Sequence, residues 1–263
     1  MNPDSPIGIF DSGVGGSSIW REIHRLLPFE NTIYLADSKN APYGHKSKDE
    51  ITALSIKNTE TLIEMGSKLI VVACNTATTN AISVLRDTYN IPIIGIEPAV
   101  KPAALQSSTK KIGILATKGT LSSILFHKTS SAFSKEITMV EIVGEGLVQL
   151  IEAGKIESDE MTSLLLEYTA PMIKENIDYL VLGCSHYPYL IPQLQQLLPS
   201  NIKILDSGEP VARHTQNTLS SLRLLRKDTN APTLRFYTNA ETETLAALLQ
   251  DFSEEISVEK KIF

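Results

Sequence analysis

Short apolar runs rich in β-branched residues alternate along this chain with longer segments of helical periodicity. Strands of a parallel sheet, which are buried on both faces, typically read as continuous apolar runs, and the helices between them form the crossovers. The alternation therefore predicts an α/β protein with parallel sheets, whose ligands bind beyond the carboxyl ends of the strands. The expected strands are residues 7–10, 32–35, 69–73, 93–96, 111–115, 138–142, 179–183 and 202–205, and the expected helices are residues 16–27, 48–65, 76–89, 122–133, 146–152, 159–174 and 190–197.

Three short motifs recur in the same order in the two halves of the chain, at offsets of 105 to 112 residues. One such match between apolar strands is weak, but three in the same order indicate a duplicated unit. The sequence therefore predicts two pseudo-symmetric α/β domains. The matched segments are 7–13 (IGIFDSG) with 112–119 (IGILATKG), 71–76 (VVACNT) with 181–186 (VLGCSH), and 96–100 (IEPAV) with 208–212 (GEPVA).

The repeat also suggests where the domains begin and end. We expect residues 1–97 and 209–263 to form the first domain, which carries Cys74, and residues 98–208 to form the second, which carries Cys184. The C-terminal segment would add helices and one short strand, residues 233–237, to the first half of the chain. Two crossings between hinged domains are expected to leave a cleft, and we place the active site in that cleft.

Composition excludes several classes of protein. The chain has 263 residues, of which 42% are hydrophobic and 21% charged, a globular rather than a disordered composition. Its net charge is −6 and no run of like charges would follow a phosphate backbone, so no nucleic-acid partner is expected. No apolar stretch approaches the roughly 20 residues of a membrane-spanning helix, and the first residues do not resemble a secretion signal. We therefore expect a soluble, cytoplasmic protein that does not bind membranes.

Cys74 and Cys184 are the only cysteines of the chain, and they occupy equivalent positions in the repeat, each at the end of an expected strand. A pseudo-twofold relation would place their thiols face to face across the cleft. The alternatives are two core cysteines, a disulfide, which a reducing compartment disfavours, and a zinc site with His186 and Asp11. No C-x-x-C or H-x-x-x-H spacing supports zinc, so no metal is expected.

Two facing thiols suit one class of reaction in particular. Inversion of a carbon stereocentre requires a base that removes a proton from one face and an acid that returns a proton to the other. A thiol, with an ordinary pKa of about 8.5, can serve as either near neutral pH if its surroundings shift that value modestly. The pair of cysteines therefore predicts a racemase or epimerase that needs no cofactor.

The residues after each cysteine are suited to binding an anion. Strand passes into helix or turn there, so free backbone N–H groups can bind a carboxylate, and Asn75, Thr76 and Ser185 add side-chain donors. The glycines of residues 10–16 permit a tight turn, but this segment matches neither nucleotide-binding pattern, G-x-G-x-x-G or G-x-x-x-x-G-K-[ST]. Asp11, in the same segment, reads equally well as a helix cap.

Three further features have both an ordinary and a functional reading. His186 is either a histidine at a strand end or a group that tunes the Cys184 thiol two residues away. Glu152 ends an apolar helix and by default is a solvated helix terminus. Residues 42–44 (PYG) form either a plain turn or part of the site.

At these residues the sequence closely resembles the bacterial glutamate racemases, in the aspartate/glutamate racemase family. The resemblance extends over most of the chain, and the motifs are specific in combination although each is short. One departure is Ser185, where the family usually has threonine; the hydroxyl is kept. The motifs are residues 11–16 (DSGVGG), 42–44 (PYG), 74–77 (CNTA), 183–188 (GCSHYP) and, more weakly, 116–120 (ATKGT).

Carried to this chain residue by residue, the resemblance implies the following roles. Cys74 and Cys184 are the two acid/base thiols, the first acting on D-glutamate and the second on L-glutamate. Asp11, His186 and Glu152 assist catalysis. The implied substrate contacts are Asp11, Ser12, Tyr43, Gly44, Asn75, Thr76, Ser185 and His186.

The implied activity is cofactor-independent racemisation of L-glutamate to D-glutamate for peptidoglycan, and hence for cell-wall biogenesis and cell shape, by a homodimer. Aspartate racemase is the nearest alternative, but that group typically has an acidic residue in place of His186. A hydrolase using Cys184 and His186 would leave Cys74 without a role. The alternative outside enzymes is a two-lobed binding protein without turnover, although such proteins are commonly exported.

Overall fold

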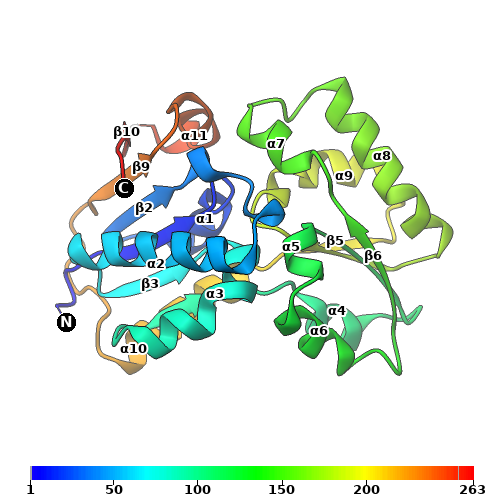
Figure 1. Cartoon of the computed structure of the whole chain (residues 1–263), viewed down its shortest axis with the longest axis horizontal. Helices are drawn as coiled ribbons and strands as arrows, with labels where there is room; N and C mark the ends of the chain where they lie inside the picture. The colour runs from blue at the N-terminus through cyan, green and yellow to red at the C-terminus, as the bar shows by residue number, and fades with distance from the viewer. Residues whose placement is uncertain (1, 254) are drawn as a thin grey trace.

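Two separate sheets, one of six strands and one of four, form the framework of the molecule, with helices packed against them (Figure 1). The computed structural model describes residues 2–253 and 255–263. The strands are β1 (Ile7–Asp11), β2 (Thr32–Ala36), β3 (Leu69–Val72), β4 (Ile93–Gly95), β5 (Lys111–Ala116), β6 (Thr138–Val143), β7 (Tyr179–Gly183), β8 (Lys203–Leu205), β9 (Leu234–Thr238) and β10 (Ile256–Lys260).

Most helices lie between consecutive strands, as crossovers of a parallel sheet require. The α-helices are α1 (Ser17–Leu26), α2 (Lys48–Glu64), α3 (Asn75–Thr88), α4 (Val100–Gln106), α5 (Lys118–Leu121), α6 (Ile124–Ser131), α7 (Leu147–Glu152), α8 (Asp159–Lys174), α9 (Ile191–Leu197), α10 (Gly208–Ser221) and α11 (Glu243–Leu248). Short 3-10 helices occur at η1 (Ser38–Asn40), η2 (Tyr43–His45), η3 (Tyr187–Leu190) and η4 (Gln250–Phe252).

The two sheets share one strand order. The six-stranded sheet runs β10-β9-β2-β1-β3-β4 and the four-stranded sheet runs β6-β5-β7-β8, with every pair parallel. Strands β2-β1-β3-β4 of the first sheet therefore correspond in order to β6-β5-β7-β8 of the second. This correspondence confirms the predicted fold class, two pseudo-symmetric α/β domains with parallel sheets.

Burial explains why the central strands were predictable. Every residue of β1, β2, β3 and β7 is buried, so both faces of these strands carry apolar side chains against helices. Pairing of β1 with both β2 and β3 places Ile7 beside Thr32 and Leu69. The carboxyl ends of these strands consequently meet at one edge of the sheet.

Three short elements were not expected from the sequence. Strand β10 pairs with β9 at the edge of the six-stranded sheet, and its residues are half-buried or exposed, so it lacks a continuous apolar run. Helices α4 and α5 contain only seven and four residues, too few for a periodic pattern. The strand expected at residues 233–237 is β9, shifted by one residue.

The chain passes to the four-stranded sheet after β4 and returns after β8, and the two passages touch. The Ser207 hydroxyl donates a 2.5 Å hydrogen bond to the Glu97 carbonyl oxygen. After the second passage α10 packs against α1, returning the chain to the first sheet (Figure 1). Within the described part of the chain, no helix combines the length and apolar character that crossing a bilayer demands.

Candidate active site

The segments that follow β1, β2 and β3 meet those that follow β5, β6 and β7 around one enclosed pocket. Both thiols line this pocket. Cys74 follows β3 and Cys184 follows β7, and these are equivalent strands of the two sheets. Cys74 is 4% exposed and Cys184 is 6% exposed. The lining residues are Ser12, Pro42, Tyr43, Gly44, Cys74, Asn75, Thr76, Thr117, Val148, Cys184, Ser185 and His186.

Cys74 lies at the amino end of α3, where its Sγ accepts a 3.3 Å hydrogen bond from the Ala77 backbone N–H. Burial, together with the nearby Asp11 carboxylate, raises the pKa of the Cys74 thiol. The Ala77 N–H and a hydrogen bond with Ser12 act in the opposite direction but do not outweigh burial. The Cys74 thiol is therefore protonated at neutral pH, in the state of an acid.

Cys184 has a different neighbour. Its Sγ lies 3.7 Å from His186 Nδ1, and His186 Nε2 lies 2.6 Å from Glu152 Oε1. Burial by itself would lower the pKa of His186, but hydrogen bonds to Cys184 and Glu152 outweigh it, and the pKa is raised well above its usual range. A proton placed between Nε2 and Glu152 leaves Nδ1 free to receive the Cys184 proton.

Glu152 is the last residue of α7. Its side chain is only 15% exposed, so the default interpretation of Glu152 as a solvated helix terminus is wrong. Besides His186, Oε1 accepts a 2.7 Å hydrogen bond from the Val14 N–H, and Oε2 accepts a 2.8 Å bond from the Ser38 hydroxyl. The reason is tertiary: the loops after β1 and β2 pack across the end of α7. Glu152 thus joins the two sheets' loops to the histidine beside Cys184.

The glycine-rich loop after β1 is shaped by these contacts. A Cβ atom at Gly13 would overlap the Glu152 carboxylate, and one at Gly15 would overlap the His186 ring. The absence of a side chain at both positions therefore lets the backbone of this loop approach Glu152 and His186 directly.

Asp11, the last residue of β1, is fully buried, and it is not the N-cap of α1, which is Gly16 without a side-chain cap. One carboxylate oxygen accepts a 2.9 Å hydrogen bond from the Gly16 N–H, next to the start of α1. The other accepts a 3.1 Å bond from the Ser185 hydroxyl, and Asp11 Oδ2 lies 4.0 Å from His186 Nδ1. Burial raises the pKa of Asp11, although the His186 charge opposes this. Asp11 thus anchors its loop and reaches the pocket through Ser185 and His186.

Asn75 offers the clearest ligand group. It is 2% exposed and lines the pocket, yet neither its amide nitrogen nor its amide oxygen has a hydrogen-bond partner in the described chain. A buried amide without partners is costly, so it is suited to pairing with a bound polar molecule. Two hydrogen bonds fix the orientation of the Tyr43 side chain. Its hydroxyl donates to the Asp37 carboxylate at 2.5 Å and accepts from the Asn58 amide at 3.2 Å.

Thr117 and Val148 line the pocket but were not selected from the sequence. The Thr117 hydroxyl lies 2.8 Å from that of Thr76 and joins the two sheets' loops across the pocket. A signal for Thr117 existed, since the repeat aligns it with Ser12 at the end of the first strand. No pattern marked Val148. Among the described residues, no group of three or more His, Cys, Asp and Glu side chains is placed to hold a metal ion.

Comparison with known proteins places this geometry among racemases. A family model described as Asp/Glu/Hydantoin racemase matches residues 7–215. A glutamate racemase from Herpetosiphon aurantiacus is 41% identical over 247 residues, covering 94% of this chain and 97% of that protein. The crystal structure of a glutamate racemase isoform from Bacillus anthracis is similar with a TM-score of 0.88 and 30% identity, covering 100% of this chain and 99% of that one. Escherichia coli glutamate racemase in complex with L-glutamate and the activator UDP-MurNAc-Ala has a TM-score of 0.83 and 33% identity, covering 97% and 98%.

Proposed function

The chain belongs to the Asp/Glu/Hydantoin racemase family and is an enzyme that racemises glutamate; from this premise we propose that Cys74 and Cys184 are its two acid/base groups. The observation that carries the proposal is the placement of both thiols in one enclosed pocket, at equivalent strand ends of two pseudo-symmetric sheets. Groups from opposite domains can reach opposite faces of a carbon held between them. Proton removal and return then need only these side chains, and no cofactor takes part.

In the direction from L- to D-glutamate, Cys184 acts as the base. His186 Nδ1 receives the Cys184 proton, and Glu152 stabilises the imidazolium through Nε2–H. The Cys184 thiolate removes the Cα proton of L-glutamate, and the Cys74 thiol donates its proton to the other face of the carbanion. One proton is taken and one is given, so charge balances. In the reverse direction Cys74 is the base, helped by the Ala77 N–H and Ser12.

The substrate contacts follow from the groups that line the pocket. The unpartnered amide of Asn75 binds a substrate carboxylate, assisted by backbone N–H groups at the start of α3. Ser12, Tyr43, Gly44, Thr76, Ser185 and His186 complete the binding surface, while Asp11 orients Ser185 and His186.

Hydrogen exchange at Cα tests the two-base mechanism. In D₂O, the wild-type enzyme should convert L-glutamate to D-glutamate that carries Cα deuterium, while the remaining L-glutamate initially keeps its proton. Replacement of either cysteine by alanine should reduce racemisation by about 10²- to 10⁴-fold. Cys74→Ala should still exchange the Cα proton of L-glutamate, and Cys184→Ala that of D-glutamate, because each keeps one base. Full racemisation by either variant would contradict the mechanism.

Variants with serine separate the one-base and two-base steps. Elimination from a glutamate analogue with a leaving group at Cβ needs only one base, so Cys74→Ser and Cys184→Ser should retain elimination from one enantiomer while losing racemisation. Equal loss of both activities would count against two-base chemistry. L-Aspartate serves as the control substrate, and its racemisation in place of glutamate would overturn the substrate assignment.

The same proposal extends to the organisation of the protein. We assign residues 1–97 with 209–263 to the domain that carries Cys74, and residues 98–208 to the domain that carries Cys184. The enzyme supplies D-glutamate for peptidoglycan in the cytoplasm and acts as a homodimer on a small-molecule substrate. Sedimentation of the purified protein tests the homodimer, since a single species at the mass of one chain would contradict it.

A further inference from the structure

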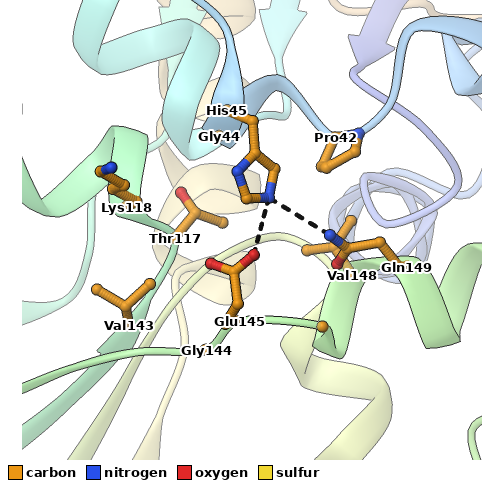
Figure 2. A pocket seen from close by; sticks show the side chains of 11 residues that line it. Pro42, Gly44, His45, Thr117, Lys118, Val143, Gly144, Glu145, Val148 and Gln149 are labelled. Carbon is orange, nitrogen blue, oxygen red and sulfur yellow. Dashed lines mark hydrogen bonds and ion pairs between the residues drawn. The ribbon is translucent and has the colours of Figure 1, made fainter.

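A second pocket, which we call the outer pocket, shares part of its lining with the catalytic one. The two pockets share Pro42, Gly44, Thr117 and Val148, so these residues form the wall between them. The outer pocket adds side chains from both domains, with His45 from η2 facing Glu145 and Gln149 from the segment that joins β6 to α7 and from α7 itself (Figure 2). The outer pocket is therefore separated from the thiol pocket only by this shared wall.

Polar contacts cross this outer pocket from one domain to the other. His45 Nε2 lies 3.1 Å from Glu145 Oε1, and the Gln149 amide nitrogen lies 3.4 Å from the same ring nitrogen (Figure 2). The His45 and Glu145 side chains are both about half exposed. His45 directly follows Gly44, which packs against Thr117 of the other domain. A bond at His45 therefore holds the Tyr43–Gly44 segment against the four-stranded domain.

The pockets are closed in this arrangement. The free volume is about 10 Å³ in the catalytic pocket and about 20 Å³ in the outer one. A cavity that holds a single water molecule has a free volume of roughly 10–15 Å³. A five-carbon amino acid therefore does not fit into either pocket in this arrangement. The domains must separate for substrate to reach the thiols, and separation at this edge breaks the contacts of His45.

We infer that His45 is a positioning residue that latches the closed cleft: its hydrogen bond to the Glu145 carboxylate holds the Tyr43–Gly44 segment over the thiol pocket and opposes opening of the domains. The inference rests on the proposed function only in taking the thiol pocket as the catalytic one. An exposed hydrogen-bonded pair stabilises its bonded state by up to about 1 kcal/mol, which corresponds to an approximately fivefold change in the open population.

The thiols themselves report on the latch, because they are the only cysteines of the chain and are enclosed by the closed pocket. We would measure the rate at which iodoacetamide alkylates the ligand-free, full-length protein. His45→Ala and Glu145→Ala should each accelerate alkylation about two- to fivefold, and the double variant should add little beyond either single one. His45→Gln keeps an N–H donor and should stay near the wild-type rate.

Glu175→Gln is the matched control. It removes an exposed ion pair with Lys111, at 3.0 Å, that lies within the four-stranded domain and not across the cleft. Its alkylation rate should equal that of the wild type. If low urea concentrations do not change the alkylation rate, the acceleration reflects opening of the cleft. If the acceleration rises with urea, it reflects unfolding, and the latch is overturned. Unchanged alkylation in His45→Ala would also overturn it.

Alkylation does not depend on turnover, so the two proposals fail separately. Saturating D-glutamate should slow alkylation of the wild type. If glutamate has no effect and is not racemised, the substrate assignment fails while the comparison of His45→Ala with Glu175→Gln still decides the latch. If glutamate is racemised but His45→Ala alkylates at the wild-type rate, the latch fails alone.

Discussion

Glu152 is the residue whose environment differs most from what its sequence position suggests. It ends a helix, where a carboxylate is ordinarily solvated and disfavoured by the helix dipole. Here it accepts hydrogen bonds from Val14 and Ser38 and pairs with His186. An unfavourable position at a helix terminus is thus offset by bonds that fix the histidine beside Cys184.

Replacement of Glu152 by glutamine tests this role. The variant keeps the shape but loses the charge that stabilises the His186 imidazolium, so kcat from L-glutamate should fall about 10- to 100-fold, the range for loss of one charge-assisted hydrogen bond. The change should be smaller from D-glutamate, where Cys74 is the base. Glu157→Gln, at an exposed position five residues later, is the control and should remain fully active.

The pH profile of the same variant gives an independent sign. Hydrogen bonds to Cys184 and Glu152 raise the pKa of His186 and keep the imidazolium present above the usual range of histidine. The imidazolium neutralises the Cys184 thiolate, which faces an anionic substrate, so activity from L-glutamate should fall as pH rises through that pKa and the thiolate is left uncompensated. Loss of the Glu152 charge lowers the pKa, so the fall should move to lower pH in Glu152→Gln. An alkaline limb at the wild-type position would show that Glu152 does not act through His186.

Sequence reasoning at this scale succeeded where the repeat applied. The chain has two cysteines, and they occupy equivalent positions in the repeat. Their common pocket could therefore be predicted from the repeat. Thr117 had the same kind of signal through Ser12. The pairing of His45 with Glu145 had none, because it depends on how the two domains meet, and no local pattern encodes that distance.

At the scale of elements, the start of β7 is secured by one buried carboxylate. Asp178 accepts hydrogen bonds from the Ser107 hydroxyl at 2.6 Å, from the Ser108 N–H at 2.6 Å and from the Thr109 N–H at 3.1 Å. Burial by itself would raise the pKa of Asp178, but these bonds outweigh it and hold the pKa well below the usual range. The loop before β5 is thereby fastened to the strand that precedes Cys184.

Asp178→Asn should lower the free energy of unfolding by about 1.5–3 kcal/mol at pH 7, as expected for loss of hydrogen bonds to a charged group. Because the pKa is depressed in the folded state, the stabilisation is fully present above the unfolded value near 4 and is lost progressively as pH falls from there through the folded value. Urea denaturation at pH 7 and at pH 3.5 should therefore separate the wild type from the variant at the first pH and bring them closer at the second. Equal differences at both would contradict the assignment.

Elements were predictable in proportion to their burial. The fully buried strands β1, β3 and β7 were found within one residue at each end, since a continuous apolar run has few other interpretations. Strand β10 was missed because its position at the sheet edge leaves its side chains half-buried or exposed. Strand β10 forms because it pairs with β9, and no pattern within residues 256–260 predicts that pairing.

At the scale of the whole molecule, duplication creates both the site and its mobility. Two similar domains bring equivalent strand ends together, which supplies two thiols to one pocket. The chain passes between the domains only after β4 and after β8, where Ser207 bonds to Glu97. Two chain passages that lie close together are suited to act as a hinge, so we expect that the cleft edge at His45 and Glu145 can separate while each sheet stays intact.

Domain closure is therefore expected to accompany substrate binding. The closed pocket excludes water, which strengthens the electrostatic interactions that stabilise a carbanion, but its free volume of about 10 Å³ requires an open form to admit glutamate. Ligand-free protein should thus populate open forms, and D-glutamate should shift it toward the closed one and reduce the radius of gyration measured by small-angle X-ray scattering.

Asn75→Ala, which removes the unpartnered amide, should need far more D-glutamate for the same change. Scattering profiles that are identical with and without saturating D-glutamate would argue that the cleft opens too rarely to matter, and that substrate reaches the thiols by local movement of the Tyr43–Gly44 segment instead.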